Sequence, residues 1–151
     1  MTPTGHTSFV IERRFKAPAA RVFAAWADPA TKQRWNDCHA ETGATEFSMD
    51  FRPGGRETYR SRLDDGTPIA VDKVFLDIVA EARIVFAYSM AIGDKALSAS
   101  LVTAEFADTP SGSTLRLTEQ LAYFDGHMDI EQRRRGTEEG LARLLLEVDA
   151  A

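Results

Sequence analysis

The sequence has little of several features that commonly define a functional class. It contains a single cysteine, Cys38, which excludes an internal disulfide and favours a reducing compartment. Apolar residues nowhere run together for about 18 positions, so no membrane-spanning helix is expected. The first residues lack a basic stretch followed by an apolar run, so no secretory signal is expected either. These absences predict a cytoplasmic protein that does not insert into a membrane.

Positive charge is also scarce. Lysine and arginine number 18 against 23 acidic residues, which gives a formal net charge of -5. An acidic chain lacks the basic surface that nonspecific nucleic-acid binding requires. It is likewise poorly suited to an anionic membrane surface. We therefore expect neither nucleic acid nor lipid bilayer as a partner.

Metal ligands and nucleophiles are few and poorly spaced. Asp37, Cys38 and His39 stand in a row, whereas zinc ligands are usually separated by two to four residues and draw on distant partners. Cys38 and His39 are also an unsuitable nucleophile pair, because adjacent side chains rarely point at each other and no third group orients them. The sequence predicts no metal, no cofactor and no catalytic residue.

What the chain does have is enough apolar material for a core. It has 151 residues, of which 44% are hydrophobic, and shows no repeat, linker or low-complexity tract. We expect one domain over 1–151, with about the first six residues disordered. Its expected strands are 7–16, 45–51, 56–63, 68–79, 83–90, 97–106 and 114–122. The expected helices are 18–26, 29–35 and 128–148.

This order of elements predicts an α+β fold. Asp28 is placed to cap the second helix, with Pro29 in its first turn. Residues 52–55, Arg-Pro-Gly-Gly, form a turn between two strands; they do not open a helix and so lack the context of a phosphate-binding loop. Alternation in the strands indicates an antiparallel sheet with one solvated face.

Two strands carry residues that are candidates for a site. In 83–90, alternation puts Phe86, Tyr88 and Met90 on one face, which we expect to face the final helix. In 114–122, Glu119 interrupts an apolar face, and a buried carboxylate must be paired or hydrogen-bonded. The aromatic residues Trp35, Tyr59, Phe86 and Tyr88 either line a pocket or belong to the core.

The final helix changes character along its length. Its C-terminal half carries the aliphatic stripe Leu141, Leu144, Leu145 and Val148. Toward the N-terminus the same face continues as Thr137 and then Arg133 or Arg134, beside Gly136 and Gly140. One interpretation is a cavity of several hundred Å3 against the sheet, in which one of the arginines pairs with Glu119. The alternative is a solvated charged face in which the glycines only ease packing.

Motifs along nearly the whole chain resemble a known family. The resemblance rests on Arg13, Phe15, Ala17-Pro18, Val22-Phe23, Trp26, Asp28-Pro29, Arg34-Trp35, Asp50 to Arg56, Asp65-Gly66, Ala82 to Phe86, Gly136-Thr137, Gly140-Leu141 and Leu144. In this order they resemble proteins named after the activator of the heat-shock-protein-ninety ATPase, within the START-like, helix-grip superfamily.

The resemblance implies a curved antiparallel sheet wrapped around a long C-terminal helix, with two short helices after the first strand and an apolar cavity inside. Related folds carry lipids, sterols, hormones and polyketides, and some are enzymes. Two positions depart from the family pattern. Thr137 stands where tryptophan is common, which should enlarge or polarise the cavity. Glu81-Ala82 stands where a proline is common, which puts the shape of that turn in question.

These observations favour a protein that binds or carries a small apolar molecule. The expected ligand-binding residues are Trp35, Tyr59, Phe86, Tyr88, Met90, Glu119, Arg133 and Thr137. One alternative is an enzyme that uses Glu119, His39 or Arg133 on a ligand in the same cavity. A partner that stimulates a chaperone ATPase ranks below both, because in its eukaryotic form that role is expected to involve a further domain. A homodimer is left open.

Overall fold

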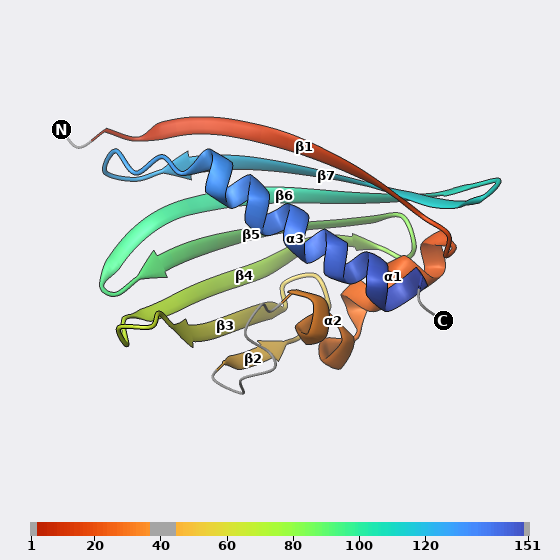
Figure 1. Cartoon of the computed structure of the whole chain (residues 1–151), viewed down its shortest axis with the longest axis horizontal. Coiled ribbons are helices and arrows are strands. Elements are labelled where there is room, and N and C mark those ends of the chain that lie inside the picture. Colours follow the sequence, from red (N-terminus) through yellow and green to blue (C-terminus); the bar gives the residue numbers. More distant parts are fainter. Residues whose placement is uncertain (1–2, 37–44, 150–151) are drawn as a thin grey trace.

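The computed structural model describes residues 3–36 and 45–149 and shows a seven-stranded sheet in which every neighbouring pair is antiparallel (Figure 1). The strand order across the sheet is β1-β7-β6-β5-β4-β3-β2. The strands are β1 (Gly5–Phe15), β2 (Glu46–Met49), β3 (Arg56–Arg62), β4 (Pro68–Val79), β5 (Arg83–Ile92), β6 (Lys95–Thr109) and β7 (Gly112–Tyr123).

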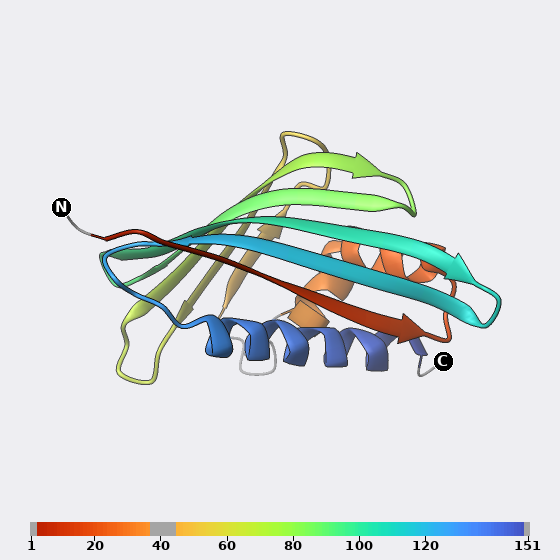
Figure 2. The ribbon, with the colours of Figure 1, turned by 90° about the horizontal axis from the view of Figure 1, so that it is seen from above.

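In the described part of the chain, three helices pack on one face of this curved sheet. They are α1 (Ala19–Ala27), α2 (Pro29–Asn36) and the long C-terminal α3 (Ile130–Asp149). Figure 2 shows α3 running along the sheet, with α1 and α2 beside its C-terminal half. The helix-grip arrangement predicted from the sequence is therefore confirmed, including the two short helices between the first two strands.

Most boundaries differ from expectation by one to three residues, and the two that matter most here are the starts of β1 and α3. β1 begins at Gly5 rather than residue 7, and its first two residues pair with β7, where Gly5 lies opposite Tyr123 and His6 opposite Ala122. Gly5 and His6, which were expected to precede the first strand, lie in it because β7 is long enough to supply a partner. α3 begins at Ile130 rather than residue 128.

Local chemistry explains where α2 begins. The carboxylate of Asp28 accepts hydrogen bonds from the backbone N–H of Thr31, at 3.0 Å, and from the Thr31 hydroxyl, at 2.6 Å. These bonds lower the pKa of Asp28, because they favour its ionised form. Pro29 follows in the first turn, where its missing N–H costs nothing. The predicted cap is confirmed, and it fixes the helix that carries Lys32 and Trp35.

The turn between β2 and β3 depends on glycine. Gly54 has φ +82°, in the left-handed region that side chains disfavour. At Gly55 an added Cβ would lie 2.0 Å from the carbonyl oxygen of Asp50, so only glycine fits. Gly54 and Gly55 also exchange backbone hydrogen bonds with Phe75 of β4. These bonds join the turn at the edge of the sheet to β4, the third strand from that edge.

The apolar core lies between the helices and the facing side of the sheet. It includes Trp26 of α1, Phe86 of β5, Leu117 of β7 and Leu144 of α3, all of which are buried. Leu145 was expected on the same stripe as Leu144, but it is 37% exposed, because the next residue of a helix points about 100° further around the axis. No helix among the described residues is long and apolar enough to cross a membrane.

Candidate functional site

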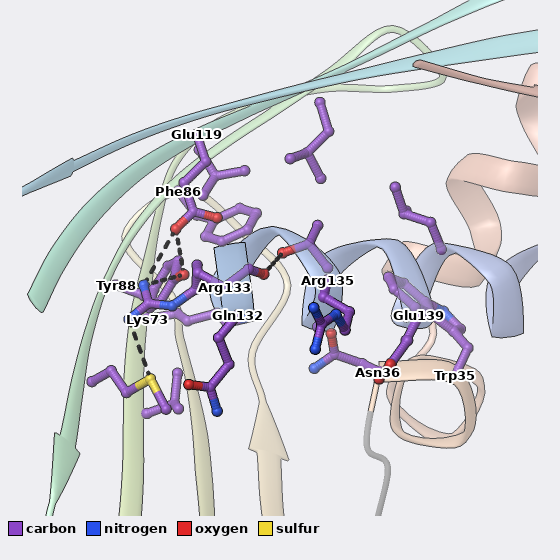
Figure 3. Close-up of a pocket in the computed structure, with 18 of the residues that line it drawn as sticks. Trp35, Asn36, Lys73, Phe86, Tyr88, Glu119, Gln132, Arg133, Arg135 and Glu139 are labelled. Carbon is purple, nitrogen blue, oxygen red and sulfur yellow. Dashed lines mark hydrogen bonds and ion pairs between the residues drawn. The ribbon is translucent and has the colours of Figure 1, made fainter. Parts of the chain in front are cut away.

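A pocket of about 600 Å3 lies between the sheet and the N-terminal half of α3. Its lining includes apolar residues from both layers, among them Trp26, Trp35, Phe86, Val102, Leu117 and Leu141. The polar residues of the lining are Asn36, Lys73, Tyr88, Glu119, Asp129, Gln132, Arg133, Arg135, Thr137 and Glu139. Figure 3 shows Lys73, Tyr88, Glu119 and Arg133 gathered on one side, with Trp35 and Asn36 on the other.

The helix leaves part of this space open where small residues, Gly136, Thr137 and Gly140, line it. A Cβ added to Gly136 would meet no heavy atom within 4 Å among its surroundings. The hydroxyl of Thr137 donates to the carbonyl oxygen of Arg133 in its own helix, at 3.1 Å, and so needs no partner across the gap. Further along α3, Leu141 and Leu144 are buried and close the space.

Glu119 is the centre of a buried polar cluster. Its Oε2 atom accepts a 2.5 Å hydrogen bond from the Tyr88 hydroxyl and a 2.9 Å bond from Ser100. The guanidinium of Arg133 lies 3.5 Å from the same oxygen. Arg133 also donates to the Tyr88 oxygen, at 3.1 Å, and to Ser98, at 2.9 Å. Donor groups from β5, β6 and α3 thus contact one carboxylate oxygen.

The members of the cluster satisfy one another away from water. Glu119 is 2% exposed, and its carboxylate is paired with Arg133 and the two hydroxyls. Burial, together with the nearby Glu119 charge, raises the pKa of Tyr88 far above its usual range. Tyr88 therefore stays protonated and serves as a donor to Glu119. The other carboxylate oxygen, Oε1, accepts no hydrogen bond from the described residues.

A second buried cluster borders the same pocket. The carboxylate of Glu57 on β3 lies 2.9 Å from the ammonium of Lys32, through Oε1, and 2.9 Å from that of Lys73, through Oε2. Lys32 and Glu57 are each 1% exposed and Lys73 is 11% exposed. Lys32 lies over the rings of Trp26 and Trp35, at 5.0 and 5.6 Å from their centroids. Of the three, Lys73 lines the pocket.

Burial and pairing act in opposite directions on this cluster. Burial lowers the pKa of Lys32 to about 8, against the opposing attraction of Glu57. Burial would raise the pKa of Glu57, but Lys32 and Lys73 together outweigh it and hold that pKa at about 2. Glu57 is thus firmly ionised at neutral pH, between two ammonium groups.

Seven of the eight residues expected to form the site line the pocket. These are Trp35, Phe86, Tyr88, Met90, Glu119, Arg133 and Thr137. Tyr59 does not line the pocket. Its pairing partner on β4, Val71, does line it, whereas Tyr59 itself lies on β3, one strand nearer the edge of the sheet. Of the two candidate arginines, Arg133 is the one that pairs with Glu119. Arg134 instead lies over the Phe9 ring and beside Glu138.

Sequence reasoning missed the cluster of Lys32, Glu57 and Lys73. A signal for one member was present, because Lys73 lies between Val71 and Phe75 at the two-residue spacing of one strand face. Glu119 was found by the same pattern. The pairing of Lys32 with Glu57 joins a helix to a strand, and no spacing rule connects them.

The described part of the chain contains no group of three or more histidine, cysteine, aspartate or glutamate residues suited to a metal ion. Asp37, Cys38 and His39, which were considered as ligands or as a nucleophile pair, lie outside the described residues.

Comparison with protein families places this fold and pocket in context. Residues 16–150 match the model of the family described as "Activator of Hsp90 ATPase homolog 1-like protein". The chain belongs to this family. The predicted resemblance is thereby confirmed over nearly the whole length. A search of functionally curated proteins finds no match.

Solved structures of two bacterial proteins are similar to this family member throughout. An uncharacterised protein from Rhizobium leguminosarum shares 42% identity over 100% of this chain and 99% of its own, with a TM-score of 0.95. A protein from Rhizobium loti shares 42% identity over 96% and 99%, with a TM-score of 0.90. At 21% identity, a Chromobacterium violaceum protein shows the same fold, with a TM-score of 0.75 over 94% of this chain and 96% of its own.

Proposed function

We propose that this protein binds a small, largely apolar molecule in the pocket between α3 and the sheet. The observation that carries the proposal is a space of about 600 Å3 with an aromatic and aliphatic wall and a few fixed polar groups. That combination is typical of small-molecule sites, in which apolar surface supplies affinity and isolated polar groups orient the ligand.

The polar groups of the lining hold one another in place. Tyr88, Ser100 and Arg133 hold Glu119 through one of its oxygens, so the carboxylate does not need to move when a molecule enters. Its Oε1 atom remains as an acceptor for a ligand hydroxyl or N–H. A preorganised anchor of this kind lowers the ordering cost of binding.

The experiment measures binding of the neutral fluorescent probe N-phenyl-1-naphthylamine. Thr137→Trp places a large side chain in the pocket, whereas Leu146→Trp adds the same side chain to α3 at a position that is 70% exposed. We expect Thr137→Trp to weaken probe binding by about tenfold or more and Leu146→Trp to leave it unchanged. Native mass spectrometry of the purified wild-type protein would also reveal a retained small molecule.

Thermal unfolding of both variants shows whether they remain folded. If folded Thr137→Trp protein binds the probe as tightly as the wild type, the pocket is not the binding site and the proposal is wrong.

A further inference from the structure

The buried charges that border the pocket do not balance. Lys32 and Lys73 share the single carboxylate of Glu57, so this buried cluster carries one uncompensated positive charge. Arg133 and Glu119, the other buried charges of the lining, compensate each other. An unpaired charge away from water is costly, and a counter-charge in the adjoining space would relieve it.

Lys73 is the member of the cluster that can reach such a counter-charge. It lines the pocket, whereas Lys32 lies behind Trp26 and Trp35. Among the described residues, Glu57 is the only anionic or hydrogen-bonding partner of the Lys73 ammonium. Its other contacts are the ring of Phe86, 4.9 Å away, and the ring of Tyr88, 5.8 Å away. A lysine ammonium donates in several directions, so N–H groups remain for a ligand.

We propose that the ligand is an amphipathic organic anion, whose single acidic group pairs with Lys73 while its apolar body fills the rest of the pocket. This inference rests on the proposed function and adds the chemical class of the ligand. Attraction to a partly desolvated ammonium discriminates an anion from a neutral molecule of the same shape far better than apolar contact does.

The other charged residues of the pocket lining are consistent with a single acidic group of the ligand beside Lys73. Arg135 and Glu139 on α3 are exposed and of opposite sign. Asp129 lies against His127, 3.0 Å away, with the Tyr123 hydroxyl also lowering its pKa. Glu119 is already paired with Arg133. None of them supplies Lys73 with a second anion, and the apolar wall from Phe86 to Leu141 suits a hydrocarbon or aromatic body.

Two fluorescent probes with the same aromatic body make the test. 8-Anilinonaphthalene-1-sulfonate is anionic, and N-phenyl-1-naphthylamine is its neutral counterpart without the sulfonate. We expect the wild type to bind the anion about tenfold more tightly, as the gain from one partly desolvated charge pair. Lys73→Met should abolish this preference, so that the variant binds the two probes with equal affinity.

Lys73→Met is expected to fold, because Glu57 keeps its partner Lys32. Lys95→Met, at an exposed position outside the lining, controls for the loss of one positive charge. Lys73→Arg, which keeps the charge, should retain the preference for the anion.

The outcomes separate the two proposals. Binding of either probe that Thr137→Trp does not weaken would overturn the proposed function itself. If Thr137→Trp does weaken binding, two results would overturn the inference about the acidic group and leave the pocket's binding role intact. One is equal wild-type affinity for the two probes, and the other is an anion preference that survives in Lys73→Met. Should Lys73→Met fail to fold, equal wild-type affinities for the two probes would still overturn the inference, and loss of the anion preference in folded Lys73→Met protein is what supports it.

Discussion

Tyr88 donates a 2.5 Å hydrogen bond to Oε2 of Glu119, although their strands, β5 and β7, are separated by β6. Ser100 on the intervening strand donates to the same oxygen, and Arg133 joins from α3. The cluster therefore links three strands to the long helix at the point where the aliphatic contacts of α3 give way to the pocket. Its removal should affect stability as well as binding.

Tyr88→Phe tests the contribution of the hydroxyl. The change keeps the ring but removes a donor to a buried carboxylate, which should lower the free energy of unfolding by about 2 kcal/mol. Urea unfolding measures the change. Ser89→Ala, on the exposed face of the same strand, should alter it by less than about 0.5 kcal/mol. Equal stability of Tyr88→Phe and wild type would mean that the hydroxyl is dispensable.

A double-mutant cycle tests the pair of Arg133 and Glu119. Arg133→Met leaves the buried carboxylate without its cation and should cost about 3 kcal/mol or more of unfolding free energy. Adding Glu119→Gln removes the carboxylate charge that has lost its partner. The double variant should therefore lose less unfolding free energy than the sum of the losses in the two single variants. Arg134→Met, whose side chain lies outside the pocket, is the control. Strictly additive losses would contradict a direct interaction.

The pH dependence of stability tests the charge state of Glu57. Its pKa is about 2 in the folded protein, below the ordinary value of 4.5. The folded state therefore binds this proton less readily than the unfolded state, and the resulting stabilisation is complete above pH 4.5. It should be lost as the pH falls from 4.5 toward 2, by an amount on the order of 3 kcal/mol.

Glu57→Gln isolates that contribution. The difference in unfolding free energy between wild type and variant should be largest near neutral pH and shrink as the pH falls through this range. A difference that is independent of pH between 2 and 6 would show that Glu57 does not titrate as described.

Gly136→Ala tests whether this position is open rather than tightly packed. Its added Cβ meets nothing within 4 Å, and alanine favours the helix over glycine, so stability should rise by about 1 kcal/mol. Gly66→Ala is a matched contrast: its Cβ also has open space, but φ is +89°, so stability should fall. Thermal unfolding of both variants measures whether each substitution stabilises or destabilises the protein. A loss of stability in Gly136→Ala would indicate an unrecognised close contact.

The fold was largely predictable because its elements have strong local signals. Alternation at Phe86 and Tyr88 correctly placed both on the face toward α3, and Asp28-Pro29 correctly marked the start of α2. The first residues of β1 were missed because Gly5 and His6 have no strand pattern of their own. Their structure depends on pairing with the end of β7, which no local rule reveals.

The site was predictable where a charge broke an apolar pattern. Glu119 and Arg133 were identified in this way, and their pairing followed from the cost of a buried charge. Lys32 was missed because α2 is mostly polar and gives no sign that one of its lysines is buried. Tyr59, also expected at the site, is not among the lining residues, since strand alternation gives the face of a residue but not how far along the sheet the pocket extends.

The pairing of β1 with β7 also has a consequence for how the chain folds. Gly5 lies opposite Tyr123, so the first strand finds its partner only after more than 100 further residues have been made. On the ribosome, β1 must remain without its native neighbour while the rest of the sheet is synthesised. Contacts so distant along the chain slow folding, typically into the range of milliseconds to seconds. The last strand thus sets the moment at which the sheet can be completed.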